Sequence, residues 1–570
     1  MNIRQVYPPR FSLRIGDAFV ALALVAFLYI GARLALGVSG SVAGPQITLD
    51  PITLPYYSAR SLLRMAAAYA LSLAFTLVYG NLAARNRRAE MVLLPVLDVL
   101  QSIPILSFLP VVVLALVNLV PAGLGVEIAA VILIFTSQAW NMTFAFYHAL
   151  ITVPKEMREA AAVFRLGWWL RFRSVELPFA TIGLVWNSMM SWAGGWFFLM
   201  AAEQFQLGDK DFRLPGLGSY LKTAAEQGDL GALLLGLGAL VILIVGLDQF
   251  VWRPVIAWAD KFNLQTVEDA NPPRSWVLDV LSRSALLEWL GRRTLSPAGE
   301  RLDAAMNWLA QAAPHRGARH GHLLRLGGWA VLLVVVALIV YAGSRGITMI
   351  GSLGLGDWLT ILASAAATFT RVLVALAFAL AWTLPVGVAI GMNHRLANRL
   401  LPIIQVVASV PATALFPVLL LLLITVSGGL SLAAVLLMLL GTQWYLLFNI
   451  IAGAMAIPQD LKYTTQSLGI SGFERWRSFI VPAIFPYLVT GLITATGGAW
   501  NASIVSEYVL FAGTTYRTLG LGALIASSSE AADFPMLMAS TLAMVIIVVL
   551  INRLFWRRLY ALAEARFHLD

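Results

Sequence analysis

Two glutamates, Glu203 and Glu507, stand near the ends of long apolar segments of the chain. A carboxylate in or beside a membrane is costly to bury, and such residues often serve a transported solute. Trp196, Trp500 and Asn501 lie about two helical turns before them and carry groups that can line a pathway. We predict that these five residues border a solute pathway. The alternative is that the carboxylates support the structure and that the tryptophans pack or anchor the segments at the interface.

Amide side chains and prolines inside other apolar segments also suggest a solute pathway. Gln138 and Gln443 can hydrogen-bond a solute, or can join neighbouring helices instead. Pro104 and Pro411 remove a helical hydrogen bond and kink the helix that contains them. Broken helices are common beside transport sites. We therefore add these four residues to the predicted pathway and expect the two prolines to act in gating.

No enzyme chemistry is predicted for this chain. It contains no cysteine, which excludes disulfides and thiolate metal sites. None of its five lysines completes the G-x-x-x-x-G-K-[ST] loop that holds nucleotide phosphates. His315, His320 and His322 cluster without acidic or thiol neighbours, so we predict no metal site there.

The composition indicates which elements must position these residues. Of 570 residues, 59% are hydrophobic and 12% are charged, against about 25% charged in a soluble domain. The apolar runs have no alternation and reach the roughly 20 residues that a spanning helix needs. Because lipid satisfies no backbone hydrogen bond, such runs must be helical. The predicted fold class is an all-α polytopic membrane protein.

The net charge of +10 describes topology rather than the solute. Arginines gather after the second apolar run, at Arg85, Arg87 and Arg88, and again between residues 257 and 322. Positive residues favour the cytoplasmic side of a membrane. We therefore expect both termini and the 257–322 segment to be cytoplasmic.

The chain repeats one unit twice. Pro104 pairs with Pro411 at an offset of 307 residues, and a later offset of 304 pairs Glu203 with Glu507. Six spans are predicted in each half, about 12 in all, so the halves are parallel repeats. The predicted domains are a first transmembrane unit at 1–256, a linker with amphipathic helices at 257–322 and a second transmembrane unit at 323–570. The expected spans are 17–37, 60–84, 92–119, 124–148, 179–204 and 230–254, followed by 324–343, 358–392, 401–425, 428–453, 483–509 and 534–555.

Each half contains one polar loop with the same frame, at 153–178 and at 457–482. Proline at the start suits the first turn of a helix. In the first loop acidic residues follow near the positive end of the helix dipole, and arginines come later. Each loop is therefore predicted to carry a short rigid helix that transmits a push to the adjacent spans.

The two loops resemble the E-A-A motif of ABC-transporter permeases, a cytoplasmic coupling helix that docks on the nucleotide-binding subunit. The first loop keeps the three motif residues Glu159, Ala160 and Ala161 but has Arg165 where the family has glycine; Gly167 lies two residues late. The second loop keeps the motif glycine as Gly469, but Tyr463, Thr464 and Thr465 replace E-A-A.

The stretches 194–203 and 498–507 are similar to the nitrate/sulfonate/bicarbonate/taurine class of these permeases. The resemblance implies two tandem six-helix type I ABC importer transmembrane domains in a bacterial inner membrane. It further implies two cytoplasmic ABC ATPases that bind ATP and Mg, an extracytoplasmic substrate-binding protein, no nucleic acid and no cofactor in this chain. The implied solute is a small oxyanion, moved by alternating access.

A repeated R-x-x-G-L-G motif, 213–218 and 517–522, is expected on the extracytoplasmic side. We predict that Arg213, Gly216, Arg517 and Gly520 dock the binding protein; the alternative is an ordinary re-entrant turn. Two other functions stay open at this stage. One is a proton- or sodium-coupled secondary transporter, which can also have twelve spans, and the other is an ABC permease for ferric ion or phosphonate.

Overall fold

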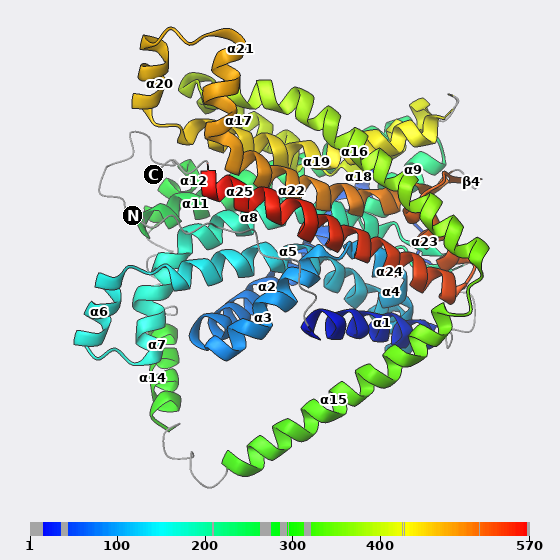
Figure 1. Cartoon of the computed structure of the whole chain (residues 1–570), viewed down its shortest axis with the longest axis horizontal. Coiled ribbons are helices and arrows are strands. Elements are labelled where there is room, and N and C mark those ends of the chain that lie inside the picture. Colours follow the sequence, from blue (N-terminus) through cyan, green and yellow to red (C-terminus); the bar gives the residue numbers. More distant parts are fainter. Residues whose placement is uncertain are drawn as a thin grey trace.

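The computed structural model describes residues 15–35, 44–207, 210–262, 275–284, 293, 296–312, 321–423, 426, 428–511 and 514–566. It is helical apart from two short antiparallel hairpins, β1–β2 and β3–β4 (Figure 1). This confirms the predicted all-α class. His315 and His320, considered above for metal binding, lie outside the described residues.

The two halves contain the same elements in the same order. The first half has α1 Ile15–Ala35, α2 Leu54–Arg85, α3 Arg87–Ser102, α4 Leu109–Leu119, α5 Ala122–Ile151, α6 Lys155–Val163, α7 Trp168–Arg171, α8 Leu177–Glu203, β1 Gln206–Leu207, β2 Lys210–Asp211, α9 Leu217–Glu226, α10 Leu230–Leu247 and α11 Arg253–Ala259. The second half has α15 Gly321–Ile350, α16 Leu355–Gly391, α17 His394–Ser409, α18 Ala412–Leu423, α19 Gly429–Ala456, α20 Gln459–Ser467, α21 Gly472–Arg475, α22 Val481–Ser506, β3 Tyr508–Phe511, β4 Thr514–Arg517, α23 Leu521–Glu530, α24 Phe534–Ile551 and α25 Arg557–Arg566. Between them lie α12 Trp276–Ser282 and α14 Ser296–Ala312.

Fewer helices qualify as spans than the twelve predicted. Among the described residues eight are long and apolar enough to cross a membrane, or nine if the bent pair α17–α18 counts as one span. The difference falls on α1, on α8 and on the pair α3–α4. Tryptophan, asparagine and serine lower the hydropathy of α8, whereas α3 and α4 are separated by a break at Pro104.

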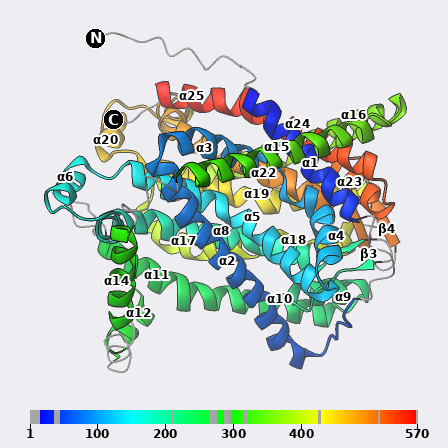
Figure 2. The ribbon, with the colours of Figure 1, turned by 90° about the horizontal axis from the view of Figure 1, so that it is seen from below.

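The halves are interlocked rather than side by side. In each half three long helices pack together, α2 with α5 and α8, and α16 with α19 and α22. The first helix of each half packs across, since α1 contacts α15 and α24 (Figures 1 and 2). Two hydrogen bonds cross at equivalent positions, Leu106 N to Asn501 Oδ1 and Thr413 Oγ1 to Phe197 O, each 3.4 Å long. The sequence repeat is therefore also a structural repeat.

A buried arginine–glutamate cluster joins the helices of the first half. Glu203, at the end of α8, is fully buried. Its Oε1 accepts hydrogen bonds from Arg64 Nη1 and Ser61 Oγ on α2, both at 2.7 Å. Its Oε2 accepts the backbone N–H of Gly218 in α9 at 2.8 Å. Arg64 also pairs with Glu127 of α5 at 2.6 Å, so the first cluster joins α2, α5, α8 and α9.

The second half repeats this cluster with one carboxylate fewer. Glu507 accepts hydrogen bonds from Thr368 Oγ1, from Arg371 Nη1 at 2.8 Å and from the backbone N–H of Gly522 at 2.9 Å. Ser431 occupies the position of Glu127 and lies 3.4 Å from Arg371 Nη2. Breaking a buried ion pair leaves an uncompensated charge, so both clusters hold α9 and α23 firmly against the long helices.

The glycines of the R-x-x-G-L-G motif allow this close approach. Gly216 and Gly520 stand directly before α9 and α23 with extended backbone. A Cβ atom on either glycine would overlap the carboxylate of Glu203 or Glu507. Both glycines are therefore needed to bury the glutamates.

The polar loops end their helices in the same way. After α6, the N–H groups of Leu166 and Arg165 bond the carbonyls of Ala161 and Ala162 at 3.0 Å, and Arg165 has φ +48°. After α20, Ile470 and Gly469 make the same two bonds, with φ +68° at Gly469. This is the left-handed helix end that glycine favours.

Arg165 therefore adopts the conformation of the missing glycine. Gly167, two residues later, has φ −60° and directly precedes α7 instead. The left-handed conformation costs a non-glycine residue roughly 1–2 kcal/mol, so the first loop is strained where the second is not.

We expect neutralisation of the buried glutamates to destabilise the halves unequally. Glu507→Gln leaves Arg371 without a carboxylate among the described residues and should lower the free energy of unfolding by about 3–5 kcal/mol. Glu203→Gln should cost less, about 1–3 kcal/mol, because Arg64 keeps Glu127. Thermal unfolding of the purified protein in detergent measures both. Equal losses would contradict the assigned difference between the clusters.

We expect Arg165→Gly to stabilise the first loop by about 1 kcal/mol, because it removes the strained Cβ. Gly469→Arg should weaken the second loop by a similar amount. Limited proteolysis of the loops, followed beside thermal unfolding, measures the change. Gly167→Ala is the matched control, since its φ is ordinary and a Cβ there meets nothing within 4 Å. A first loop cut faster in Arg165→Gly would contradict the assignment.

Candidate functional site

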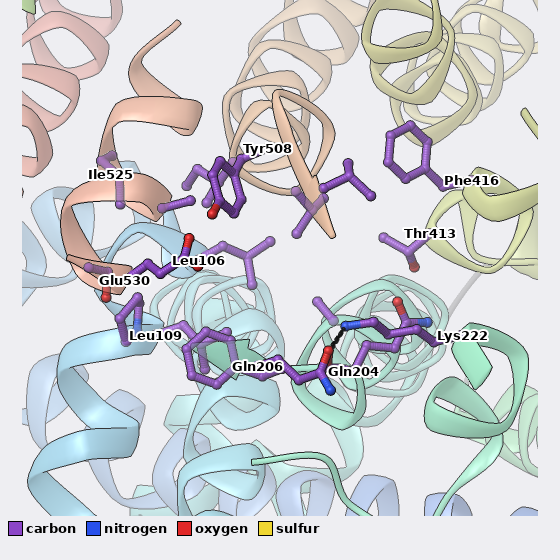
Figure 3. A pocket seen from close by; sticks show the side chains of 18 of the residues that line it. Leu106, Leu109, Gln204, Gln206, Lys222, Thr413, Phe416, Tyr508, Ile525 and Glu530 are labelled. Carbon is purple, nitrogen blue, oxygen red and sulfur yellow. Dashed lines mark hydrogen bonds between the residues drawn. The ribbon is translucent and has the colours of Figure 1, made fainter. Parts of the chain in front are cut away.

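A cavity of about 190 Å³ lies where the two halves meet (Figure 3). Residues of α4, α8, α9 and β1 line it from the first half, and residues of α18, α22, α23 and β3 from the second. Several lining positions are related by the sequence repeat: 106 with 413, 109 with 416, 110 with 417, 201 with 505, 204 with 508, 205 with 509, 222 with 526 and 225 with 529. The cavity therefore lies on the axis that relates the halves.

The two sides of the cavity differ chemically although their positions match. Lys222 corresponds to Ala526 of the second half, and Gln204 corresponds to Tyr508. Conversely, Ser529 replaces an alanine of the first half. Among the described lining residues Lys222 is the one cation and Glu530 the one carboxylate. The cavity thus has a single charged group on each side among its described lining residues.

Lys222 lies on α9, in the turn that follows the first arginine–glutamate cluster. Its Nζ donates hydrogen bonds to Gln206 Oε1 at 2.6 Å and to the backbone carbonyl of Gln204 at 3.1 Å. The Glu226 carboxylate is 3.8 Å away. Burial lowers the pKa of Lys222 to about 8, against the opposing influence of Glu226. The lysine is therefore charged at neutral pH and close to titration.

None of the predicted pathway residues is among those that line this cavity. Glu203 and Glu507 belong to the arginine–glutamate clusters. Trp196 and Trp500 are fully buried, Trp500 stacking on Phe369. Their contribution to transport stays a prediction.

The remaining pathway predictions fall on helix contacts and helix breaks. Gln138 accepts from Ser72 within the first half, and Gln443 accepts from Trp382 at 3.0 Å within the second. The Asn501 amide lies on the seam between the halves, as described above. The predicted interruptions of the helices are present: Pro104 separates α3 from α4, and Pro411 separates α17 from α18.

The cavity residues were missed because no motif marks them. Lys222 differs from its repeat partner Ala526, whereas Glu530 has a glutamate, Glu226, as its partner. The predicted pathway residues were drawn mostly from positions that the two repeats share. A search for differences between the halves inside matched segments would have found Lys222, Gln204 and Ser529.

The predicted docking arginines are placed differently in the two halves. Arg213 Nη2 pairs with Asp211 at 2.7 Å and Arg213 Nη1 donates to Thr223, so this arginine is largely buried. Arg517 lies at the end of β4 and is exposed. Contact with a binding protein stays a prediction for both and for the two glycines.

The coupling motifs project from the end of the molecule opposite the cavity. Figures 1 and 2 both show α6 and α20 at one end, and α9 and α23 at the other. In α6, Glu159 and Ala160 are exposed and Ala161 is buried; in α20, Tyr463 and Thr464 are exposed and Thr465 is buried. The two motifs thus present the same face despite their different residues.

Large apolar side chains on both loops are exposed as well. Val163 and Phe164 are 79% and 75% exposed, and Leu468, the equivalent of Phe164, is 69% exposed. Exposed apolar patches mark surfaces that bind another protein or a membrane. Both loops therefore carry a surface suited to a partner.

Relatives of this chain are membrane subunits of transport systems. A taurine transport system permease of Escherichia coli (strain K12) is 28% identical over 206 residues, 36% of this chain and 71% of that protein. A nitrate import permease of Synechocystis is 28% identical over 144 residues, 25% of this chain and 51% of that protein. A bicarbonate transport system permease of Synechococcus elongatus is 29% identical over 153 residues, 27% of this chain and 52% of that protein. The chain thus spans about half the length of the nitrate and bicarbonate relatives.

The family itself is matched twice, once in each half. Residues 76–251 and 383–568 each match the binding-protein-dependent transport system inner membrane component family. The two matched segments contain both polar loops, both glutamates and all of the cavity residues. The chain therefore belongs to the family of inner membrane permease components of binding-protein-dependent transport systems, with two copies of the family unit in one polypeptide.

Proposed function

We propose that this chain forms the whole membrane pathway of an ATP-driven importer in a bacterial inner membrane. The observation that carries the proposal is the placement of two matched coupling motifs at one end and a cavity between the halves at the other (Figure 1). One polypeptide supplies both units, whereas the taurine, nitrate and bicarbonate relatives are much shorter.

Two cytoplasmic ABC ATPases, which bind ATP and Mg, dock on the loops at 153–178 and 457–482. Support comes from the exposed faces of α6 and α20 and from the apolar side chains beside them. Closure of the ATPases pushes both loops, and the long helices that continue from them, α8 and α22, carry the movement to the cavity. Alternating access of the cavity to the two sides of the membrane follows from that rocking.

A substrate-binding protein docks at the opposite end, near the R-x-x-G-L-G motifs, and releases a small solute into the cavity. The names of the relatives favour a small oxyanion such as nitrate, bicarbonate or a sulfonate. Among the described lining residues, Lys222 is the cation that would bind such an oxyanion.

Reconstitution tests the proposal. The chain, placed in vesicles with its ATPases and binding protein, should take up solute only when ATP is supplied. Uptake driven by a proton or sodium gradient without ATPase subunits would contradict it and favour a secondary transporter.

The first coupling motif gives a sharper prediction. The Glu159 side chain is about two-thirds exposed. Its one ion pair among the described residues is with Lys155, at 3.5 Å. Charge reversal in a docking surface creates like-charge contacts and unpaired groups. We expect Glu159→Lys to weaken ATPase binding about tenfold or more, and ATP-driven uptake with it, while membrane insertion is unchanged.

Two variants serve as controls, with co-purification of the ATPases as the measurement. Asp50→Lys reverses an exposed carboxylate before α2, outside both polar loops, and should leave ATPase binding unchanged. Tyr463→Lys places the same new charge at the equivalent position of the second loop and shows whether both loops bind alike. Unchanged binding and uptake in Glu159→Lys would refute the assigned contact.

A further inference from the structure

The linker helix α14 packs against the first polar loop. It contacts α7, the short helix that follows the coupling motif of that loop (Figure 1). From α7 the helical chain runs without a break through residues 172–176 into α8. At its far end α8 reaches Glu203 and contributes Ala201 to the wall of the cavity. The linker therefore touches one end of a continuous rod whose other end borders the cavity.

One carboxylate of α14 makes the contact. Asp303 Oδ1 accepts a hydrogen bond from Trp169 Nε1 at 2.8 Å, and Asp303 Oδ2 forms an ion pair with Arg173 Nη1. Trp169 and Arg173 are four residues apart and so lie on one face of the helix. The Asp303 side chain is only 22% exposed. Because hydrogen bonds to a charged group are the stronger kind, Asp303 ties two successive turns of the first loop to the linker.

The second loop has the same positions without this contact. The offset of 304 residues pairs Trp169 with Phe473 and Arg173 with Arg477. Trp169 is partly buried, whereas Phe473 is 81% exposed and Arg477 is exposed as well. The surface that α14 covers on α7 is thus open on α21. The chain has one linker between its halves, and that linker lies on the first loop.

The base of the first loop is held by ion pairs on its other side too. Glu176 is buried and pairs with Arg85 of α2 at 2.6 Å and with Arg171 of α7 at 2.8 Å. At the positions of Glu176 and Arg85 the second half has Ile480 and Met392, which pack in one apolar cluster. The first loop is therefore fixed by charges both to α2 and to α14, and the second by apolar contacts.

We propose that α14 is a brace of the first polar loop and that Asp303 is the positioning residue of this brace. The brace keeps α7 rigid against α8, so that a push on α6 moves α8 instead of bending the loop between Arg165 and Gly167. The two loops are then mechanically unequal, the first strained and braced, the second unstrained and open. The effect on transport rests on the proposed coupling function, whereas the brace itself does not.

Hydrogen exchange of backbone amides tests the brace without any ATPase. The purified full-length chain in nanodiscs is followed by mass spectrometry over residues 165–176 and 469–480. Asp303→Ala removes both contacts and should raise the exchange rate of α7 about tenfold, with the second loop unchanged. Asp303→Asn keeps an acceptor for Trp169 and should raise it less. Asp279→Ala removes an exposed carboxylate of the other linker helix, α12, and should change neither loop.

A double-mutant cycle shows that the effect passes through the assigned contact. Trp169→Phe installs the residue of the second loop and removes the indole N–H. In that background Asp303→Ala should raise exchange less than it does in the natural chain, because part of its contact is already lost. Independent, multiplying effects of the two substitutions would overturn the assignment. So would unchanged exchange of α7 in Asp303→Ala, or an equal rise in both loops, which would show general loosening of the fold.

The positioning role has a readout that a purely structural contact would not change. In vesicles with the ATPases and the binding protein, Asp303→Ala should lower the solute taken up per ATP hydrolysed by about threefold or more. ATPase binding should stay unchanged, in contrast to Glu159→Lys, and Asp279→Ala should keep the natural ratio. An unchanged ratio despite faster exchange of α7 would refute the positioning role. Failure of the natural chain to bind ATPases would refute the proposed function and leave the brace intact.

Discussion

The structure depends on two buried carboxylates. Glu203 and Glu507 each end a long helix in an apolar environment, where an isolated charge is very costly. Each is compensated by an arginine of another long helix and by backbone N–H groups of the short helix that follows. Because the compensation requires all these partners together, the short helices α9 and α23 are fixed in place. Those helices carry Lys222 and Glu530 to the cavity.

Duplication explains both the symmetry of the cavity and the differences between its two sides. The framework uses the same residue types in both halves: arginine, glutamate, glycine and a helix-breaking proline. Inside that framework the cavity positions have diverged, with lysine against alanine and glutamine against tyrosine. A cavity made from two identical units would have the same side chains on both sides of the axis. The fused chain instead has a lysine on one side only, at Lys222, where the other half has Ala526.

The two ends of the molecule have different surfaces. At one end α6 and α20 expose matched faces with apolar side chains, and at the other the cavity lies between the halves. The coupling motifs have diverged in sequence, yet Arg165 and Gly469 take the same left-handed conformation. The conformation of the loop is therefore kept where the residue is not, at the expense of strain in the first loop.

The sequence alone determined the helical membrane class, the duplication and the two matched polar loops, because each follows from a local pattern: apolar run length, a constant offset or a proline frame. It also marked Glu203, Glu507 and the R-x-x-G-L-G glycines as special, but assigned them to pathway and docking separately. Only the tertiary structure joined them, because the contact of Glu203 with Arg64 and Gly218 links residues far apart in the chain. The cavity likewise was decided by the packing of one half on the other, since no local pattern records which side chains face each other across an axis.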